Sequence, residues 1–184
     1  MRVITGTARG RKLSSPEGFS VRPTADRVKE AIFSMIQFEL EQSRVLDLFA
    51  GSGQLGIEAL SRGAKSAVFI DLDRDNAEII KSNLKLTGLM KDAVVSVMNA
   101  ADYLRTTRDA FDIVFVDPPY RSGLIEACMP LLVPKLSESA VVLCETDDKE
   151  KLPEIFGSFA LKKRNRYGKT AIWVYRRIES DEQA

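Results

Sequence analysis

The chain has 184 residues, of which 45% are hydrophobic and 29% are charged, and its formal net charge is +1. These values exclude an intrinsically disordered chain, and the absence of an apolar run near about 20 residues excludes a membrane-spanning helix. The sequence contains no histidine, which excludes histidine bases and histidine-ligated metals, and its length predicts one compact domain.

The first 25 residues are expected to form a basic N-terminal extension, and residues 26–184 a single domain. Residues 1–24 have a net charge of +4, because they carry one acid against Arg2, Arg9, Arg11, Lys12 and Arg22. Residues 162–177 carry seven basic side chains and no acid. Basic ends around an acidic middle indicate nucleic-acid binding, although solvated surface charge would give the same pattern. Since the extension has no apolar stretch of the secretion-signal type, we expect a cytoplasmic protein.

Helical spacing of apolar residues predicts a first helix at about residues 28–41, after which strands and helices alternate. We expect strands at residues 45–49, 67–70, 93–98, 111–116 and 140–145, and helices at residues 54–61, 74–87, 101–106 and 124–133. The nearly continuous apolar strands indicate a parallel sheet covered by helices on both faces. Residues 159–166 and 169–177 predict an antiparallel hairpin at one edge of this sheet.

Three motifs fall at the carboxyl ends of predicted strands, where open parallel sheets bind their ligands. After the first strand, Gly51 and Gly53 lead into a helix, so the backbone can approach a ligand and the helix offers free N–H groups. Asp71 ends the second strand, where a carboxylate can accept from both hydroxyls of a ribose. The third motif, Asp-Pro-Pro-Tyr at residues 117–120, ends the fourth strand. Each motif is common by itself, but the three together at matching strand ends are specific.

The third motif indicates chemistry on an amino group of a nucleobase. Its prolines fix the loop and have no N–H, so their carbonyl oxygens are free to accept. The Asp117 carboxylate and the Pro118 carbonyl oxygen can both accept from one exocyclic amine, which directs the nitrogen lone pair at an electrophile. Tyr120 can stack on the base, which is worth about 1–3 kcal/mol. The motif therefore predicts methyl transfer from a sulfonium donor held in line with the amine, a reaction that needs no strong base.

Longer stretches around these motifs resemble a known family. The run that begins Asp-Leu-Phe-Ala-Gly-Ser-Gly at residue 47 and extends to residue 64, with the motif at 117–120, resembles the class I S-adenosylmethionine-dependent methyltransferases. Three further stretches limit the resemblance to one family within this class: pieces of residues 2–13, the Arg-Pro-Thr stretch at 22–33, and Tyr-Gly-Lys-Thr at 167–170. Together they are similar to the bacterial 16S rRNA guanine-N(2) methyltransferases of the RsmD family, over roughly residues 1–177.

The resemblance implies an α/β, Rossmann-like fold of three layers, αβα, with a seven-stranded, mostly parallel sheet whose last strand is reversed in the C-terminal hairpin. It implies S-adenosylmethionine as the cofactor, with its methionine part on the glycine-rich loop, its ribose at Asp71 and its adenine beside residues 99–101. The family usually has glutamate at the position of Asp71, so we expect a shifted ribose contact of the same chemistry. The residues expected to bind the cofactor are Asp47, Phe49, Ala50, Gly51, Ser52, Gly53, Asp71, Leu72, Asn99, Ala100, Ala101 and Asp117.

The implied substrate is the 2-amino group of a guanine in 16S rRNA, within the small ribosomal subunit or its assembly intermediate. The catalytic residues would be Asp117, Pro118 and Tyr120, without a metal ion, in a monomeric protein. The residues expected to contact the RNA phosphates are Arg2, Arg9, Arg11, Lys12 and Arg22. Arg22 adjoins the first helix and could reach the cofactor instead.

Three alternatives remain open. The tetrapeptide serves equally for the 6-amino group of adenine in DNA or RNA, and nothing in it selects guanine. A non-catalytic nucleotide- or RNA-binding assembly factor is a different class of protein on the same fold. Gly51, Gly53 and Gly56 also match the dinucleotide-binding fingerprint of oxidoreductases. In a nucleotide-binding module or an oxidoreductase, however, the tetrapeptide would have no role.

Overall fold

The computed structural model describes residues 1–15 and 26–179. The helices in these ranges are α1 (Asp26–Met35), α2 (Gln54–Ser61), α3 (Arg74–Thr87), α4 (Ala100–Thr106) and α5 (Leu124–Leu132). The strands are β1 (Arg44–Asp47), β2 (Ser66–Asp71), β3 (Ala93–Val97), β4 (Phe111–Val116), β5 (Leu136–Asp147), β6 (Ile155–Phe156), β7 (Phe159–Tyr167) and β8 (Thr170–Arg177). Two 3₁₀ turns, Met90–Asp92 and Val133–Lys135, precede β3 and β5. None of these helices is long and apolar enough to cross a membrane.

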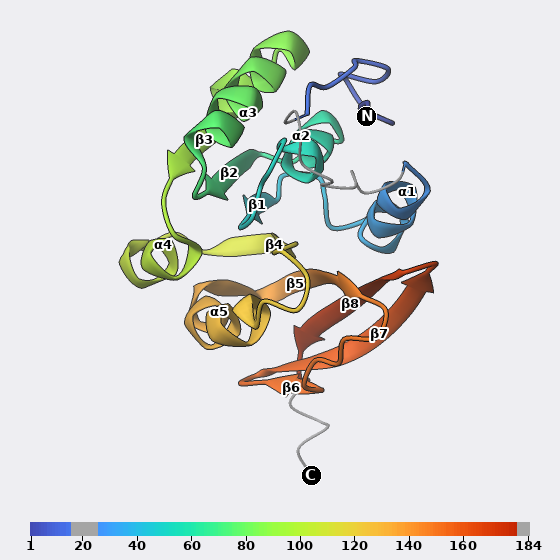
Figure 1. Cartoon of the computed structure of the whole chain (residues 1–184), viewed down its shortest axis with the longest axis vertical. Coiled ribbons are helices and arrows are strands. Elements are labelled where there is room, and N and C mark those ends of the chain that lie inside the picture. Colours follow the sequence, from blue (N-terminus) through green and yellow to red (C-terminus); the bar gives the residue numbers. More distant parts are fainter. Residues whose placement is uncertain (16–25, 180–184) are drawn as a thin grey trace.

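The strands form one sheet in the order β3-β2-β1-β4-β5-β8-β7-β6 (Figure 1). The strands from β3 to β5 in this order are parallel to their neighbours, whereas β8 lies antiparallel between β5 and β7. The predicted fold class and the hairpin with its reversed strand are confirmed. The sheet has one strand more than expected, because the two-residue β6 pairs with the start of β7. Two residues are too few to show a period in the sequence.

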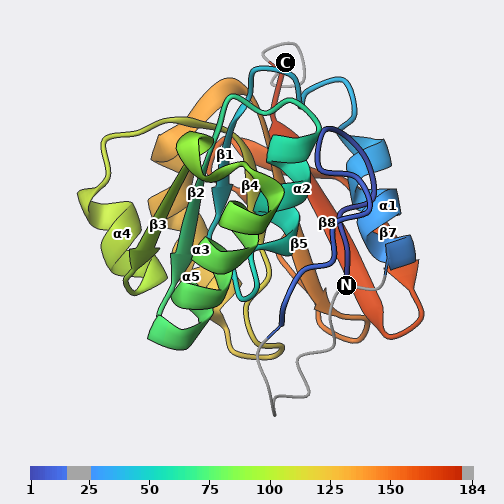
Figure 2. The same ribbon diagram turned by 90° about the horizontal axis from the view of Figure 1, so that it is seen from above.

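Helices cover both faces of the sheet and complete three layers (Figure 2). α1, α2 and α3 lie on one face, and α4 and α5 lie on the other. Because side chains alternate along a strand, β4 directs Ile113 and Phe115 into the core under α1–α3 and Val114 and Val116 into the core under α4 and α5. This burial on both faces explains the continuous apolar runs in the sequence.

The first helix is shorter than predicted. α1 ends at Met35, and a turn follows in which the Glu39 amide donates to the Ile36 carbonyl oxygen at 3.1 Å. Ile36 and Leu40 nevertheless pack in the core under α1–α3. Their helical spacing therefore reflects burial of the turn and not continuation of the helix.

Residues 1–15, the described part of the N-terminal extension, pack against α2 on the α1–α3 face (Figure 1). Val3, Ala8 and Leu13 are buried in the same core as that face. Gly6 has a φ of +87°, and a Cβ there would lie 1.7 Å from the Ser61 carbonyl oxygen, so the close approach requires glycine. The predicted division of the chain at residue 25 falls outside the described residues and stays a prediction.

Candidate active site

Four acidic side chains lie at the carboxyl edge of the parallel strands. Asp47 ends β1, Asp71 ends β2, Asp117 follows β4, and Glu145 lies near the end of β5. β1 pairs in parallel with both β2 and β4, and β4 pairs in parallel with β5. The sheet therefore brings the three predicted motifs to one edge, together with an acid that the motifs did not include.

Asp71 holds the glycine-rich loop between β1 and α2. Gly51 and Gly53 have φ values of +54° and +77°, which glycine adopts without strain. The Gly51 amide donates to Asp71 Oδ2 at 2.7 Å. Asp71 Oδ1 accepts from the Asp73 amide at 2.9 Å and from Asn76 Nδ2 at 3.1 Å. The residue expected to bind a ribose thus also fixes the loop expected to hold the methionine part.

The surroundings of this loop fit a ligand. A Cβ added to Gly51 would meet no atom within 4 Å. Gln54, the first residue of α2, is only 9% exposed, and its Oε1 has no hydrogen-bond partner among the described residues. Leu72 is 70% exposed beside Asp71. These surroundings suit a ligand with an amino group and a flat ring. The amino group would donate to the unpartnered acceptor, the ring would pack on the exposed apolar side chain, and the open backbone leaves space for the ligand.

Other residues expected to bind the cofactor have structural contacts of their own. Ser52 Oγ donates to Met1 Sδ at 3.3 Å. Asn99 Oδ1 caps α4 by accepting from the Ala101 amide at 2.9 Å. Three further residues are buried or half-buried: Phe49, Ala50 and Ala100. Their contacts with a cofactor stay predictions.

Asp47 lies beneath the loop and supports the start of α2. Its side chain is 2% exposed, and its Oδ2 accepts from the Gly56 amide at 3.0 Å. A Cβ at Gly56 would lie 2.3 Å from the Phe69 ring, so glycine is what lets α2 pack on β2. Burial raises the pKa of Asp47 to about 7. Direct contact of Asp47 with the cofactor stays a prediction.

Tyr120 anchors the tetrapeptide that follows β4. Its Oη donates to Glu145 Oε1 at 2.9 Å and lies 3.1 Å from Thr170 Oγ1. Burial, followed by the Glu145 charge, raises the pKa of Tyr120, so the hydroxyl stays protonated at neutral pH. Tyr120 remains 43% exposed. The hydroxyl is therefore held at its far end while part of the side chain faces solvent.

Asp117 is half-buried, and Pro118 beside it is buried. Burial raises the pKa of Asp117 well above its usual value, and the charges of Glu145 and Asp47 add to this effect. These surroundings favour the protonated form of Asp117, whose carbonyl oxygen can still accept a hydrogen bond from a substrate. Raised pKa values of this kind are common at functional sites, although structural clusters produce them too.

Glu145 and Thr170 are absent from the residues predicted from the sequence. Glu145 carries a usable signal, because an acid at the end of an apolar strand is the feature that singled out Asp71 and Asp117. Thr170 carries no such signal. It reaches this edge because β8 runs antiparallel to β5 and begins there, opposite Asp147. Only the three-dimensional pairing of the hairpin reveals that contact.

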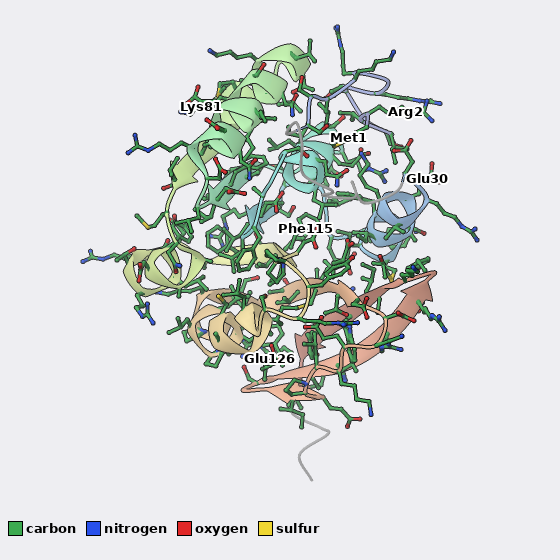
Figure 3. All side chains as sticks on the ribbon, in the orientation of Figure 1. Met1, Arg2, Glu30, Lys81, Phe115 and Glu126 are labelled. Atoms are coloured by element: carbon green, nitrogen blue, oxygen red, sulfur yellow. The ribbon has the colours of Figure 1, made fainter. Side chains whose placement is uncertain are left out.

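The basic side chains of residues 1–15 lie on the α1–α3 side. Arg2 pairs with Asp26 of α1 at 3.3 Å. Figure 3 shows Arg2 on the same side of the sheet as Lys81 and on the opposite side from Glu126. Arg22 lies outside the described residues. Four of the predicted RNA contacts have exposed side chains: Arg2, Arg9, Arg11 and Lys12.

Two surface hollows lie away from this edge. Phe38 and Asp112 line one of them, and Leu40 and Arg62 line the other. Asp112 stands near the start of β4, so the first hollow opens at the opposite end of the parallel strands. Within residues 1–15 and 26–179, no three cysteine or acidic side chains gather where they could hold a metal ion.

Known proteins are similar to this chain over nearly its whole length. Residues 1–176 match the family model described as Conserved hypothetical protein 95. Ribosomal RNA small subunit methyltransferase D of Escherichia coli (strain K12) is 37% identical over 184 residues, which cover 99% of this chain and 92% of that protein. The solved structure of yhhF from Escherichia coli has a TM-score of 0.84 at 37% identity and covers 96% of this chain and 97% of its own. A ribosomal protein L11 methylase from Lactobacillus delbrueckii subsp. bulgaricus shares the fold, with a TM-score of 0.68 at 23% identity over 81% of this chain and 77% of its own.

Proposed function

Because the chain belongs to the family described as Conserved hypothetical protein 95, which confirms the family expected from its motifs, we propose that it methylates a guanine 2-amino group in 16S rRNA. The methyl donor in this proposal is S-adenosylmethionine. The observation that carries the proposal is the arrangement of Asp117 and Tyr120 at the same edge as the loop held by Asp71. The name of the Escherichia coli relative supports ribosomal RNA of the small subunit as the substrate.

The residues around the glycine-rich loop suit this cofactor. When bound, S-adenosylmethionine supplies an electrophilic methyl carbon on a positively charged sulfur. The amino end of α2 favours the methionine carboxylate, since helix N-termini attract anions. Gln54 Oε1, which lacks a donor among the described residues, would accept from the methionine ammonium group. Asp71 would accept from the ribose hydroxyls, and the exposed side chain of Leu72 would pack on the adenine.

Asp117 and the Pro118 carbonyl oxygen would hold the amino group of the guanine. Each accepts one N–H, which leaves the nitrogen lone pair facing the methyl carbon. As the bond from nitrogen to carbon forms and the bond from carbon to sulfur breaks, the nitrogen becomes positively charged. It then loses a proton to Asp117 or to water, so a strong base is unnecessary. Holding the two reacting atoms in line supplies much of the rate.

Tyr120 would support the plane of the guanine. Its hydroxyl is fixed by Glu145 and Thr170, so the ring loses little further freedom when a base stacks on it. Stacking of a base on an aromatic side chain is worth about 1–3 kcal/mol. Tyr120 therefore contributes position and affinity and takes no part in proton transfer.

The exposed basic side chains of the N-terminal extension would bind RNA phosphates. Such contacts supply affinity without sequence specificity, and salt weakens them. The substrate we propose is 16S rRNA within the small ribosomal subunit or its assembly intermediate, modified by a monomeric protein in the bacterial cytoplasm. The target nucleotide would then be selected by its position on the assembled particle and would need no separate recognition domain in the protein.

Methylation of rRNA by the purified protein tests the proposal. Small-subunit particles from cells that lack the protein are incubated with labelled S-adenosylmethionine and digested to nucleosides. We expect label in N2-methylguanosine at one position. Label in N6-methyladenosine would instead support the adenine alternative, and absence of label would favour a non-catalytic RNA-binding factor.

A further inference from the structure

Glu145 lies next to Asp117 on the neighbouring strand. Val116 of β4 pairs with Cys144 of β5 in parallel register, so the two acids follow a matched pair of residues. The side chains of Val116 and Cys144 both point into the core under α4 and α5. Alternation along the strands turns the next side chain of each to the opposite face. Both carboxyl groups therefore lie on the α1–α3 side of the same edge.

The surroundings of these two acids are rich in hydrogen-bond acceptors. The Glu145 carboxylate, the carbonyl oxygen of the Asp117 carboxyl group and the Pro118 carbonyl oxygen can accept, whereas Pro118 and Pro119 have no N–H to donate. The Tyr120 hydroxyl donates to Glu145 already. A base that presents several donors side by side fits these surroundings. A base with an acceptor beside its amino group does not.

Guanine is the base with that pattern of donors. Its N1–H adjoins the two N–H bonds of its 2-amino group. Adenine presents the acceptor N1 beside its amino group, and cytosine presents the acceptor N3. An acceptor that faces a buried carboxylate makes no hydrogen bond and is repelled, so adenine and cytosine would be rejected.

We propose that Glu145 selects guanine by accepting its N1–H, while Asp117 and Pro118 hold the 2-amino group. This inference rests on the proposed function and adds the base selection that the tetrapeptide lacks. A carboxylate can accept several hydrogen bonds at once, and the Tyr120 hydroxyl donates one of them to Oε1. The same bond keeps the Glu145 side chain in place at the edge, where the residue is 7% exposed.

The test compares guanine with 2,6-diaminopurine at the mapped target position of otherwise identical rRNA in reconstituted small-subunit particles. Both bases carry a 2-amino group, but diaminopurine has an acceptor at N1 where guanine has N1–H. The wild-type protein is expected to prefer guanine by about 100-fold or more in kcat/KM, because a site built for an N–H rejects a base without it.

Two variants show whether the carboxylate at position 145 causes the preference. Glu145→Gln introduces an amide that can donate to N1 of diaminopurine, so the preference for guanine is expected to fall about 10-fold or more. Thr170→Val is the matched control, because it removes the other partner of Tyr120 and keeps the carboxylate. Its preference is expected to stay within about threefold of the wild-type value.

Equal use of the two bases by the wild-type protein overturns the inference. An unchanged preference in Glu145→Gln also overturns it, provided that this variant binds S-adenosylhomocysteine with wild-type affinity. If the variant does not fold, the wild-type comparison alone decides. The proposed function fails by a different result, namely that the wild-type protein forms no N2-methylguanosine on the particle with guanine. That result would overturn the inference as well.

Discussion

Lys29 and Glu58 form an ion pair in which both side chains are fully buried, with Nζ and Oε2 3.3 Å apart. The Glu58 carboxylate also accepts from the amides of Ile4 at 2.8 Å and Thr5 at 2.9 Å. Lys29 Nζ donates in addition to the Arg2 carbonyl oxygen. The pair therefore joins α1, α2 and the N-terminal extension at one point, and the extension carries the basic side chains proposed to bind RNA.

Replacing Glu58 with alanine is expected to destabilise the protein strongly. The substitution leaves the Lys29 amine buried without a counter-charge, which costs about 3–5 kcal/mol of unfolding free energy. Urea denaturation followed by circular dichroism measures the loss. The control is Glu78→Ala, which removes an exposed pair with Lys81 and should leave the midpoint nearly unchanged. Equal midpoints for the two variants would contradict a structural role for the buried pair.

The titration of Asp47 is expected to make the stability of the protein depend on pH. Burial raises its pKa to about 7, so the folded chain holds this proton more tightly than the unfolded chain does. Its contribution to stability is therefore complete below about pH 4 and is lost as the pH rises through about 7, a difference of roughly 4 kcal/mol. Asp47→Asn keeps an acceptor for the Gly56 amide and removes the titration.

The unfolding free energy of Asp47→Asn should consequently vary less between pH 4 and pH 8 than that of the wild-type protein. At pH 8 the variant should be the more stable of the two. Asp117, whose pKa is also raised, leaves a smaller decline of the same sign in the variant. Identical pH profiles for variant and wild type would show that Asp47 does not titrate as described.

Replacing Asp117 is expected to slow methyl transfer without lowering the affinity for RNA. Asp117→Ala removes one acceptor for the guanine amine, and kcat is expected to fall about 100- to 1,000-fold. Asp117→Asn retains a carbonyl oxygen as acceptor and should keep more activity than the alanine variant. Single-turnover methylation and filter binding of rRNA measure the two quantities. Wild-type methylation by Asp117→Ala would exclude this residue from the chemistry.

The N-terminal extension predicts a change in the salt dependence of RNA binding. Replacing Arg9, Arg11 and Lys12 with glutamine should weaken binding and reduce the slope of log K against log salt by about 2 to 3. A charge-matched control replaces three exposed basic residues near the β3 edge and α4: Lys91, Arg105 and Arg108. An equal reduction of the slope in the control would mean that the extension has no special role.

Most of the fold could be predicted because its physical causes are local in the sequence. β1, β2 and β4 are buried on both faces and read as apolar runs, and a residue of a recognisable motif ends or directly follows each of them. The end of α1 could not be placed in this way, since Ile36 and Leu40 keep helical spacing in a turn that is buried for the same reason as the helix.

The parts of the site that could not be predicted depend on contacts between distant residues. Tyr120 and Glu145 lie 25 positions apart and meet only because β4 and β5 end together. A lysine side chain is ordinarily exposed, yet Lys29 is buried, and the N-terminal extension covers it. A single sequence shows which residues end a strand, but not which side chain from another element closes over them.

A crystal structure of the protein with S-adenosylhomocysteine tests the central claim most directly. The account predicts the methionine part of the ligand against residues 51–53, its ribose at Asp71, and its sulfur facing Asp117 and Pro118 within reach of a base stacked on Tyr120. A ligand bound elsewhere, with the tetrapeptide remote from its sulfur, would contradict the account regardless of the family to which the chain belongs.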